Sequence, residues 1–155
     1  MVHEYYTKLE QFMKRHLVEY KHMIYETSCH TIDDAVLSSK EPKENFVKNI
    51  CMIDNRGDLI VAIVLANARA STSRVAKVLD IDRPRLATTD EVFSKTGYPA
   101  GGVPSFSYNA RYLVDEKVME KKFIITGGGS EFALIKIKPK DMLILNKGEV
   151  TRIRK

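Results

Sequence analysis

The 155-residue sequence has no tryptophan, only two cysteines and no long apolar run. No segment approaches the roughly 18 consecutive apolar residues of a membrane span. Charges spread over residues 1–20 leave no apolar core for a signal peptide, so we expect a cytoplasmic protein without a membrane partner. Cys29 and Cys51 have neither a CxxC pair nor a histidine at zinc spacing. Their spacing allows a disulfide, but free thiols are the expected state.

The sequence also lacks the fingerprints of common catalytic and nucleotide-binding sites. It has no GxxxxGK(S/T) or GxGxxG phosphate loop, no GxSxG elbow and no HExxH helix. Its four histidines all lie in the N-terminal fifth, without a paired acid or a metal-binding constellation. We therefore predict no metal site and no Ser/His/Asp set. Surface or capping roles are expected for His3, His16, His22 and His30.

The composition is that of an ordinary globular protein. Hydrophobic residues make up 44% and charged residues 29%, enough for a core without metal or disulfide staples. The length fits a single domain over residues 1–155. The formal charge of +5 suits a polyanionic partner, although many proteins that bind no nucleic acid share it. The basic cluster at residues 147–155 is expected to be a solvated end.

Helical periodicity marks the N-terminus and several later segments. Apolar residues at three- and four-residue intervals predict an amphipathic helix at about residues 4–20. Thr31 with Asp34 resembles a capping box, which predicts a second helix that ends before Pro42. Three further positions carry helix-start signals: Ser71, the Thr88 and Glu91 capping pair with Gly97 as a left-handed end, and Pro139.

Strand patterns lie between these helices. Residues 46–53 and 59–66 predict a hairpin around turn residues 55–58, and the apolar character of 59–66 predicts burial on both faces. Helices and strands mix irregularly, so the sequence predicts an α/β or α+β fold with a mixed sheet. Further strands are expected at 111–114, 123–126, 132–137 and 149–153.

Two glycine-rich loops, residues 97–104 and 127–129, are the first candidates for a ligand site. Glycine lets backbone N–H groups approach a phosphate or an oxyanion closely, although a tight turn also explains either loop. Lys48 opens an apolar strand, where its ammonium group can point into a cleft and bind phosphate or polarise a carbonyl. From the residues alone, the prediction ends at a basic α/β domain with a glycine-lined pocket and one suggestively placed lysine.

Three stretches form a specific pattern when taken together. They are Val47-Lys48-Asn49-Ile50, the loop TGYPAGGVP at 96–104, and Thr126-Gly127-Gly128-Gly129-Ser130 followed by Ile135-Lys136-Ile137, Pro139 and Asp141. Their order and spacing, from roughly Tyr25 to Met142, resemble the YbaK/ProX family. That family comprises free-standing aminoacyl-tRNA deacylases, similar to the editing domain inserted in bacterial prolyl-tRNA synthetases.

The resemblance implies a compact, mixed, barrel-like β-sheet surrounded by helices, with a pocket for the 3′ end of aminoacyl-tRNA and hydrolysis without metal or cofactor. Lys48 matches the family's essential lysine, which holds the terminal phosphate or orients the ester. Gly101, Gly102 and Val103 match the loop whose backbone amides position the carbonyl and stabilise the oxyanion. The other substrate-binding positions that the resemblance implies are Tyr25, Asn49, Gly128, Gly129 and Ser130.

The resemblance also implies trans-editing of mischarged aminoacyl-tRNA, with an aminoacyl-tRNA synthetase as a further partner. The family uses the substrate's 2′-hydroxyl and an ordered water in place of a protein nucleophile, so positioning supplies most of the catalysis. The absence of a triad is then expected.

This chain departs from the family pattern at two places. The final glycine of the first loop region is Ser107, which is expected to reshape the pocket rim. Cysteinyl-specific members carry an acid in the strand after the second glycine loop, where this chain has Leu134. That argues against a cysteinyl-tRNA(Pro) specialist. The changed segment 105–108 and the long N-terminal helix leave open a non-catalytic tRNA-binding or synthetase-associated module of the same fold.

Overall fold

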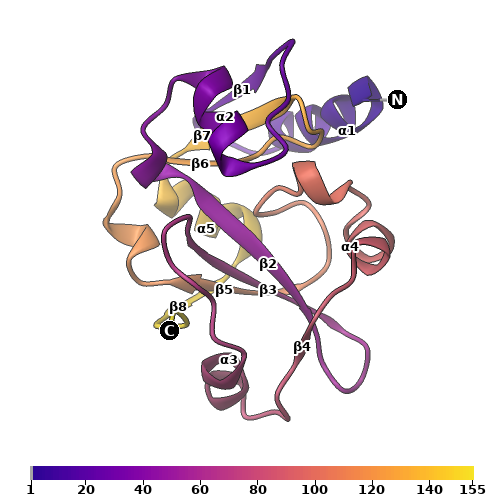
Figure 1. Ribbon diagram of the computed structural model, residues 1–155, viewed down its shortest axis with the longest axis vertical. Helices are drawn as coiled ribbons and strands as arrows, with labels where there is room; N and C mark the ends of the chain where they lie inside the picture. The colour runs from indigo at the N-terminus through magenta and orange to yellow at the C-terminus, as the bar shows by residue number, and fades with distance from the viewer. Residues whose placement is uncertain (1) are drawn as a thin grey trace.

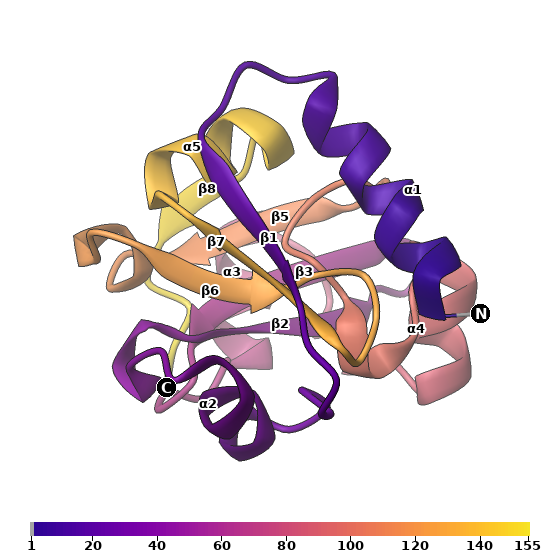
Figure 2. The ribbon, with the colours of Figure 1, turned by 90° about the horizontal axis from the view of Figure 1, so that it is seen from above.

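The computed structural model describes residues 2–155, apart from the side chains of Val2 and His3. The role expected for His3 lies outside these described side chains. Figure 1 shows a three-stranded sheet of order β1-β7-β6 above a five-stranded sheet of order β4-β2-β3-β5-β8. Seen from above in Figure 2, β1 and β7 cross over β2 and β3. The mixture of helices and strands confirms the predicted α/β (α+β) class.

The three-stranded sheet is antiparallel, with β7 in the centre. It consists of β1 (Tyr20–Ile24), β6 (Ile124–Gly127) and β7 (Ala133–Ile137). β7 pairs with β1 along one side and with β6 along the other. The loop between β6 and β7 carries the second glycine-rich segment, so this sheet places it at one end of the hairpin.

The five-stranded sheet is mixed. β2 (Val47–Ile53) and β3 (Leu59–Leu65) form the predicted antiparallel hairpin, and β4 (Arg85–Leu86) extends it beside β2. β5 (Arg111–Asp115) runs parallel to β3, and β8 (Glu149–Thr151) runs parallel to β5. Six of the seven β3 residues are buried, as the apolar run predicted, because both faces of this central strand are covered.

The main core fills the space between the two sheets. Alternate residues of β3, Val61 and Ile63, meet Ile135 and Ile137 of β7 there, together with Leu9 from the N-terminal helix. The intervening residues of β3 face away from the three-stranded sheet and pack against the helix that follows β3 in the chain. A smaller cluster lies at the junction of the sheets and contains Cys29, Ala35, Phe46, Ile125 and Leu134. Both cysteines are buried and free, as expected.

Local capping signals explain where the shorter helices begin. α2 (Ile32–Ser39) begins after Thr31, whose hydroxyl accepts the Asp34 N–H, and α3 (Thr72–Leu79) is capped in the same way by Ser71. α5 (Pro139–Asn146) begins at its proline, where a missing N–H costs nothing. Three short 3₁₀ turns complete the chain: η1 (Lys43–Asn45), η2 (Ala100–Gly102) and η3 (Val118–Glu120).

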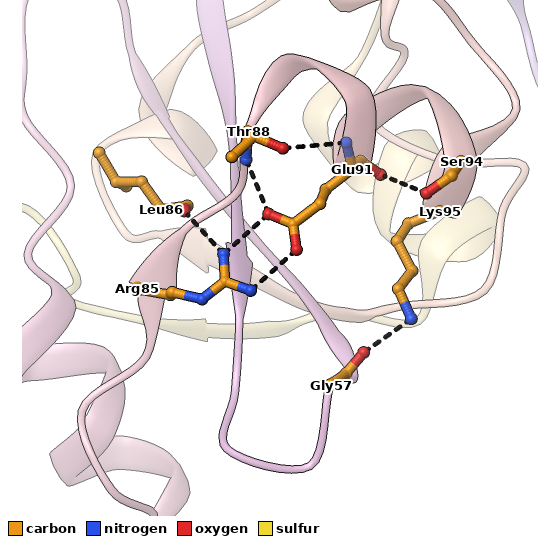
Figure 3. A network of polar contacts seen from close by, with 7 residues as sticks. All are labelled: Gly57, Arg85, Leu86, Thr88, Glu91, Ser94 and Lys95. Carbon is orange, nitrogen blue, oxygen red and sulfur yellow. Dashed lines mark hydrogen bonds and ion pairs between the residues drawn. The ribbon is translucent and has the colours of Figure 1, made fainter.

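The capping box of α4 (Thr89–Thr96) extends into an ion-pair network, drawn in Figure 3. Thr88 and Glu91 bond reciprocally through side chain and backbone, and Gly97 ends the helix with φ 79°. Arg85 donates to both carboxylate oxygens of Glu91, at 2.7 and 2.8 Å. The box therefore ties the helix to strand β4. Hydrogen bonding from Arg85 is the main reason that the pKa of Glu91 falls from 4.5 to about 2.

The expected barrel-like sheet is wrong in one respect, because the strands form two sheets and do not close. β2 and β6 approach each other at one corner, where an isolated parallel bridge between Phe46 and Ile125 is the one strand-type pairing between the sheets within residues 2–155. The crossing of the two sheets carries their strands apart beyond this bridge (Figure 2). The corner stays open, and a pocket forms beside it.

The N-terminal helix is shorter than predicted. α1 (Val2–Lys14) is followed by a turn in which the Arg15 and His16 N–H groups donate to the carbonyls three residues earlier. The His16 ring also lies 2.8 Å from the Phe12 carbonyl. Tyr20 belongs to β1 and pairs with Ile137, although it also fits the helical spacing of the preceding residues. The prediction of residues 4–20 therefore merged a helix with the start of an unpredicted strand.

None of the helices described within residues 2–155 combines the length and the apolar character that a bilayer-spanning helix requires.

A buried carboxylate anchors the C-terminal segment. Asp115, at the end of β5, is fully buried and accepts the backbone N–H groups of Ile153 and Arg154 at 3.0 and 3.1 Å. Its other oxygen lies 3.0 Å from the Arg154 guanidinium and accepts the Lys117 N–H. A buried charge with this many donors stabilises the fold only while all its partners are present.

Asp115→Ala is expected to lower the free energy of unfolding by about 3 kcal/mol, since it leaves buried donors and a guanidinium unpaired. Urea denaturation followed by circular dichroism measures the loss. The control is Glu116→Ala, which removes an exposed carboxylate 3.5 Å from the same guanidinium and should cost less than about 1 kcal/mol. Equal losses in the two variants would contradict the role given to burial.

The capping network predicts an acid-side loss of stability. Glu91 has a depressed pKa in the folded state, so its contribution is full above about pH 4.5 and disappears as the pH falls toward about 2. Glu91→Gln should flatten the dependence of the melting temperature on pH in this window. Asp90→Asn, in the same helical turn, is the control and should leave the slope unchanged. An unaltered slope in the Glu91 variant would show that the ion pair has no energetic role.

Candidate functional site

A pocket of about 210 Å³ opens at the corner where the two sheets meet. Its walls come from α2, β2, β6, β7 and the turn η2. Figure 1 shows α2 and the ends of β2 and β6 gathered on this side of the molecule. The pocket is lined by residues from segments far apart in the sequence: Cys29 to Ile32, Ala35, Phe46 to Asn49, Ala100, Gly101, Val103, Ile125 to Gly127 and Leu134.

The two largest hollows offer less for chemistry. One, of about 570 Å³, lies around Phe123 and Lys136, and the lysine there is already paired with Glu41 at 3.1 Å. The other, of about 600 Å³, is a surface depression among the aspartates that flank the β2–β3 turn. Within the described residues, no group of three or more His, Cys, Asp or Glu is placed to hold a metal ion. The smaller pocket is distinguished by joining a lysine, backbone glycines and an apolar floor.

Lys48 lies at one wall of the pocket, near the start of β2. Its side chain is half buried, and among residues 2–155 its ammonium group has no hydrogen-bond or ion-pair partner. Burial, followed by the positive charge of Arg69, lowers the pKa of Lys48. A cation that is partly desolvated and lacks a carboxylate partner is placed to take an anionic ligand.

Asn49 is the centre of a closed hydrogen-bond network behind the pocket. Its amide nitrogen donates to the Val103 carbonyl and to Thr126 Oγ1, both at 3.0 Å. Ser105 Oγ donates to Asn49 Oδ1 at 2.6 Å and lies 2.7 Å from Thr126 Oγ1. Both amide hydrogens of Asn49 are engaged in these bonds. Asn49 therefore ties β2 to β6 and to the first glycine loop.

The two glycine loops pack directly on each other. A Cβ atom on Gly102 would lie 2.6 Å from backbone atoms of Ser130 and 2.7 Å from the Gly129 carbonyl carbon. The Gly129 N–H donates to the Gly102 carbonyl at 2.8 Å, and the Gly102 N–H donates to the Pro99 carbonyl at 2.9 Å. Gly102 thus faces the second loop, and its N–H is already used. The N–H of Gly101 has no partner of this kind among the described residues.

The second loop lies behind the pocket wall for most of its length. Gly128 bonds to Ala133, and its carbonyl lies 2.7 Å from Nε2 of the buried His22 ring. Ser130 is buried, and its hydroxyl accepts the Phe132 N–H. Of the sequence-predicted residues, the pocket lining contains Lys48, Asn49, Gly101 and Val103. It does not contain Gly102, Tyr25, Gly128, Gly129 or Ser130, and the lining residue of the second loop is Gly127.

His30 stands at the mouth of the pocket and was expected only to have a surface or capping role. Its ring covers Gly101 so closely that a Cβ there would lie 2.2 Å from Nδ1. The ring is 56% exposed, and its Nδ1 lies 3.9 Å from a carboxylate oxygen of Glu131. Little in the sequence indicated this position, because the contact between His30 and the first glycine loop depends on how the turn before α2 folds.

The floor of the pocket is apolar. Phe46, Ile125 and Leu134 line it, together with Ala35 and Cys29 from the α2 side. Burial raises the pKa of the Cys29 thiol, so this cysteine is a small neutral wall residue. Leu134, at the position where the resemblance implies an acid in cysteinyl-specific members, is one of the residues that line this pocket. Tyr25 packs beside the same cluster from outside the lining.

Ser107 has a backbone conformation that favours glycine. Its φ is 83°, in the left-handed region that L residues rarely adopt. Its hydroxyl lies 2.7 Å from the Tyr98 hydroxyl, a bond that glycine cannot make. Ser107 does not line the pocket, so this serine does not reshape the pocket rim as the sequence had led us to expect.

Comparisons with solved structures show that other proteins share this fold. The hypothetical protein APE2540 is 25% identical, with a TM-score of 0.88 over 96% of this chain and 99% of that chain. A proposed trans-editing enzyme for prolyl-tRNA synthetase is 22% identical, with a TM-score of 0.86 over 97% of this chain and 96% of that one. A proposed signal transduction protein from Marinobacter aquaeolei VT8 shares the fold at 15% identity and a TM-score of 0.65, over 96% of this chain and 30% of its own.

A comparison with curated proteins gave no significant match. The model of the aminoacyl-tRNA editing domain matches residues 26–145, a range that includes every residue of the pocket lining. With most of its length matched, the chain belongs to the aminoacyl-tRNA editing domain family.

Proposed function

We propose that this protein is a trans-editing deacylase, which hydrolyses the ester between a wrong amino acid and the 3′ end of its tRNA. The observation that carries the proposal is the pocket itself. It combines an unpartnered cation, Lys48, with the free backbone amide of Gly101 above an apolar floor. Membership of the editing-domain family supports the same reaction. The partner is therefore mischarged aminoacyl-tRNA.

Lys48 binds the phosphate of the terminal nucleotide in this proposal. A phosphodiester would neutralise its charge, which the surrounding protein leaves without a carboxylate. The lysine acts as a point charge, so it also sets where the ester enters the pocket. Loss of this position costs rate because the reacting groups must be held in a productive geometry.

Gly101 is the oxyanion donor in this scheme. Its N–H, like those of Ala100 and Val103, has no backbone acceptor among the described residues, whereas that of Gly102 is bonded to Pro99. The donor points from a turn whose backbone is held by the Asn49 network, so it needs no reorganisation as charge develops. Gly102 supports the turn from behind through its contact with Ser130.

Water is the nucleophile, oriented by the substrate's own 2′-hydroxyl. Water oxygen adds to the ester carbonyl carbon, and the bond from that carbon to the ribose 3′-oxygen breaks. The proton removed from water ends on the leaving 3′-oxygen, which leaves a free amino acid and uncharged tRNA. Positioning then supplies most of the acceleration.

The apolar floor selects the amino acid. A cavity of about 210 Å³ with Phe46, Ile125 and Leu134 at its floor has room for a small side chain, and these three floor residues carry no charge that could pair with a charged one. Discrimination by size in such a pocket is modest, about 1–3 kcal/mol per methylene. We therefore propose small uncharged amino acids as substrates.

The alternative of a non-catalytic module depended on the changed segment 105–108 and on the long N-terminal helix. Two observations weaken it: Ser105 joins the Asn49 network, and Ser107 has a left-handed φ that favours glycine. A relative that shares the fold is named for editing alongside prolyl-tRNA synthetase, which brings an aminoacyl-tRNA synthetase into the proposal as a partner. Work in the cytoplasm, where aminoacyl-tRNA is made, is part of the same proposal.

A panel of mischarged tRNAs, beginning with alanyl-, seryl- and cysteinyl-tRNA, tests the activity. The wild type should release the amino acid from at least one of them, and Lys48→Ala should lower kcat/KM by about 10²–10³-fold while keeping its circular dichroism spectrum. Lys140→Ala, at an exposed position on α5, should behave as the wild type. If the wild type leaves the whole panel intact yet binds tRNA, the non-catalytic module replaces the deacylase.

The two neighbouring glycines should respond differently to alanine. Gly102→Ala collides with the backbone of the second loop and should lower the melting temperature by several degrees, consistent with overpacking costs of about 1–3 kcal/mol. Gly101→Ala meets the exposed His30 ring, which can swing away, so its melting temperature should stay near that of the wild type. Its kcat/KM should nevertheless fall, because the new methyl group occupies the mouth of the pocket. Thermal unfolding and deacylation assays separate the two, and equal melting temperatures would contradict the packing role of Gly102.

A further inference from the structure

Several cations of this protein are neutralised by carboxylates, but Lys48 and Arg69 are not. Lys43 pairs with Asp33 at 2.9 Å, and Arg154 pairs with the buried Asp115. Within residues 2–155, neither the ammonium group of Lys48 nor the guanidinium group of Arg69 has an ion pair or a hydrogen bond. These two side chains therefore present uncompensated positive charge.

The backbone at Arg69 is held firmly, although its side chain is exposed. The Lys155 N–H donates to the Arg69 carbonyl at 2.8 Å, and the Ser71 N–H donates to the Ile153 carbonyl at 2.8 Å. Between them, Ala70 forms an antiparallel bridge with Arg154. The guanidinium group thus projects from a fixed position on the connection between β3 and α3.

The fold brings this position to the same end of the β2–β3 hairpin as Lys48. Lys48 pairs with Val64, one residue before β3 ends at Leu65, and the Ala68 N–H turns back to the Leu65 carbonyl at 2.9 Å. The charge of Arg69 is close enough to lower the pKa of Lys48, second only to burial. Two like charges near each other, neither paired with a carboxylate, repel, and an anion bound by both relieves that repulsion.

We propose that Lys48 and Arg69 form a two-cation clamp for successive phosphates of the single-stranded 3′ end of tRNA. Lys48, at the pocket wall, holds the phosphate nearest the ester, and Arg69, outside the pocket, holds the next phosphate along the strand. This inference rests on the proposed function. It adds a residue outside the pocket lining that sets affinity for the RNA and orients the strand as it enters.

Binding of uncharged tRNA, followed by fluorescence anisotropy over a range of salt concentrations, tests the clamp. Arg69→Ala should raise Kd about fivefold to tenfold at low salt and reduce the slope of log K against log salt by about 0.7, the value for one lost contact to a single strand. Arg69→Lys, which keeps the charge, should recover most of the affinity. In deacylation assays, Arg69→Ala should raise KM and leave kcat unchanged.

Arg56→Ala is the matched control, since this exposed arginine lies in the turn at the opposite end of the same hairpin. It should change neither Kd nor the salt slope. If Arg69→Ala binds and hydrolyses as the Arg56 variant does, the clamp is wrong and the deacylase stands. If the wild type hydrolyses no aminoacyl-tRNA but its tRNA binding still depends on Arg69, the deacylase is wrong and the clamp stands.

Discussion

The hydrogen-bonded triangle of Asn49, Ser105 and Thr126 is the interaction on which the pocket depends. The three side chains come from different parts of the chain: β2 of the five-stranded sheet, the residue directly after the first glycine loop, and β6 of the three-stranded sheet. Strand pairing joins the sheets at this corner through a single bridge, so the triangle supplies the polar connection that the backbone does not. Because each member is bonded to the other two, loss of one leaves two polar groups unsatisfied in a largely buried place.

Much of the fold could be predicted because its signals are local. A capping residue and the amide that it accepts lie three positions apart, so Thr31, Ser71 and Thr88 predicted the starts of their helices, and the structure confirms all three. The apolar run of β3 predicted its burial on both faces for a similar reason. β1 was not predicted, since it is held by pairing with β7, more than a hundred residues away, and its residues fit helical spacing as well.

The sequence predicted which segments form the candidate site, but not the role of each residue within it. The motifs located Lys48 and both glycine loops, but they could not tell which glycine faces a ligand and which faces protein. That difference arises only when the loops meet, since Gly102 lies against Ser130 while Gly101 lies under His30. His30 carried only a weak signal, because it meets the first glycine loop through a turn that is distant from that loop in the sequence.

The contact between the two glycine loops has a consequence for how such a site can change in evolution. Gly102 packs against the backbone of residues 129–130 with no space between them, so neither loop can gain a side chain there unless the other loop moves away. The apolar floor has no such restriction, because Ala35, Ile125 and Leu134 come from separate elements and each can be exchanged alone. New substrate preferences are therefore expected to arise by substitutions at the floor of the pocket, while the packed glycine loops stay the same in proteins of different specificity.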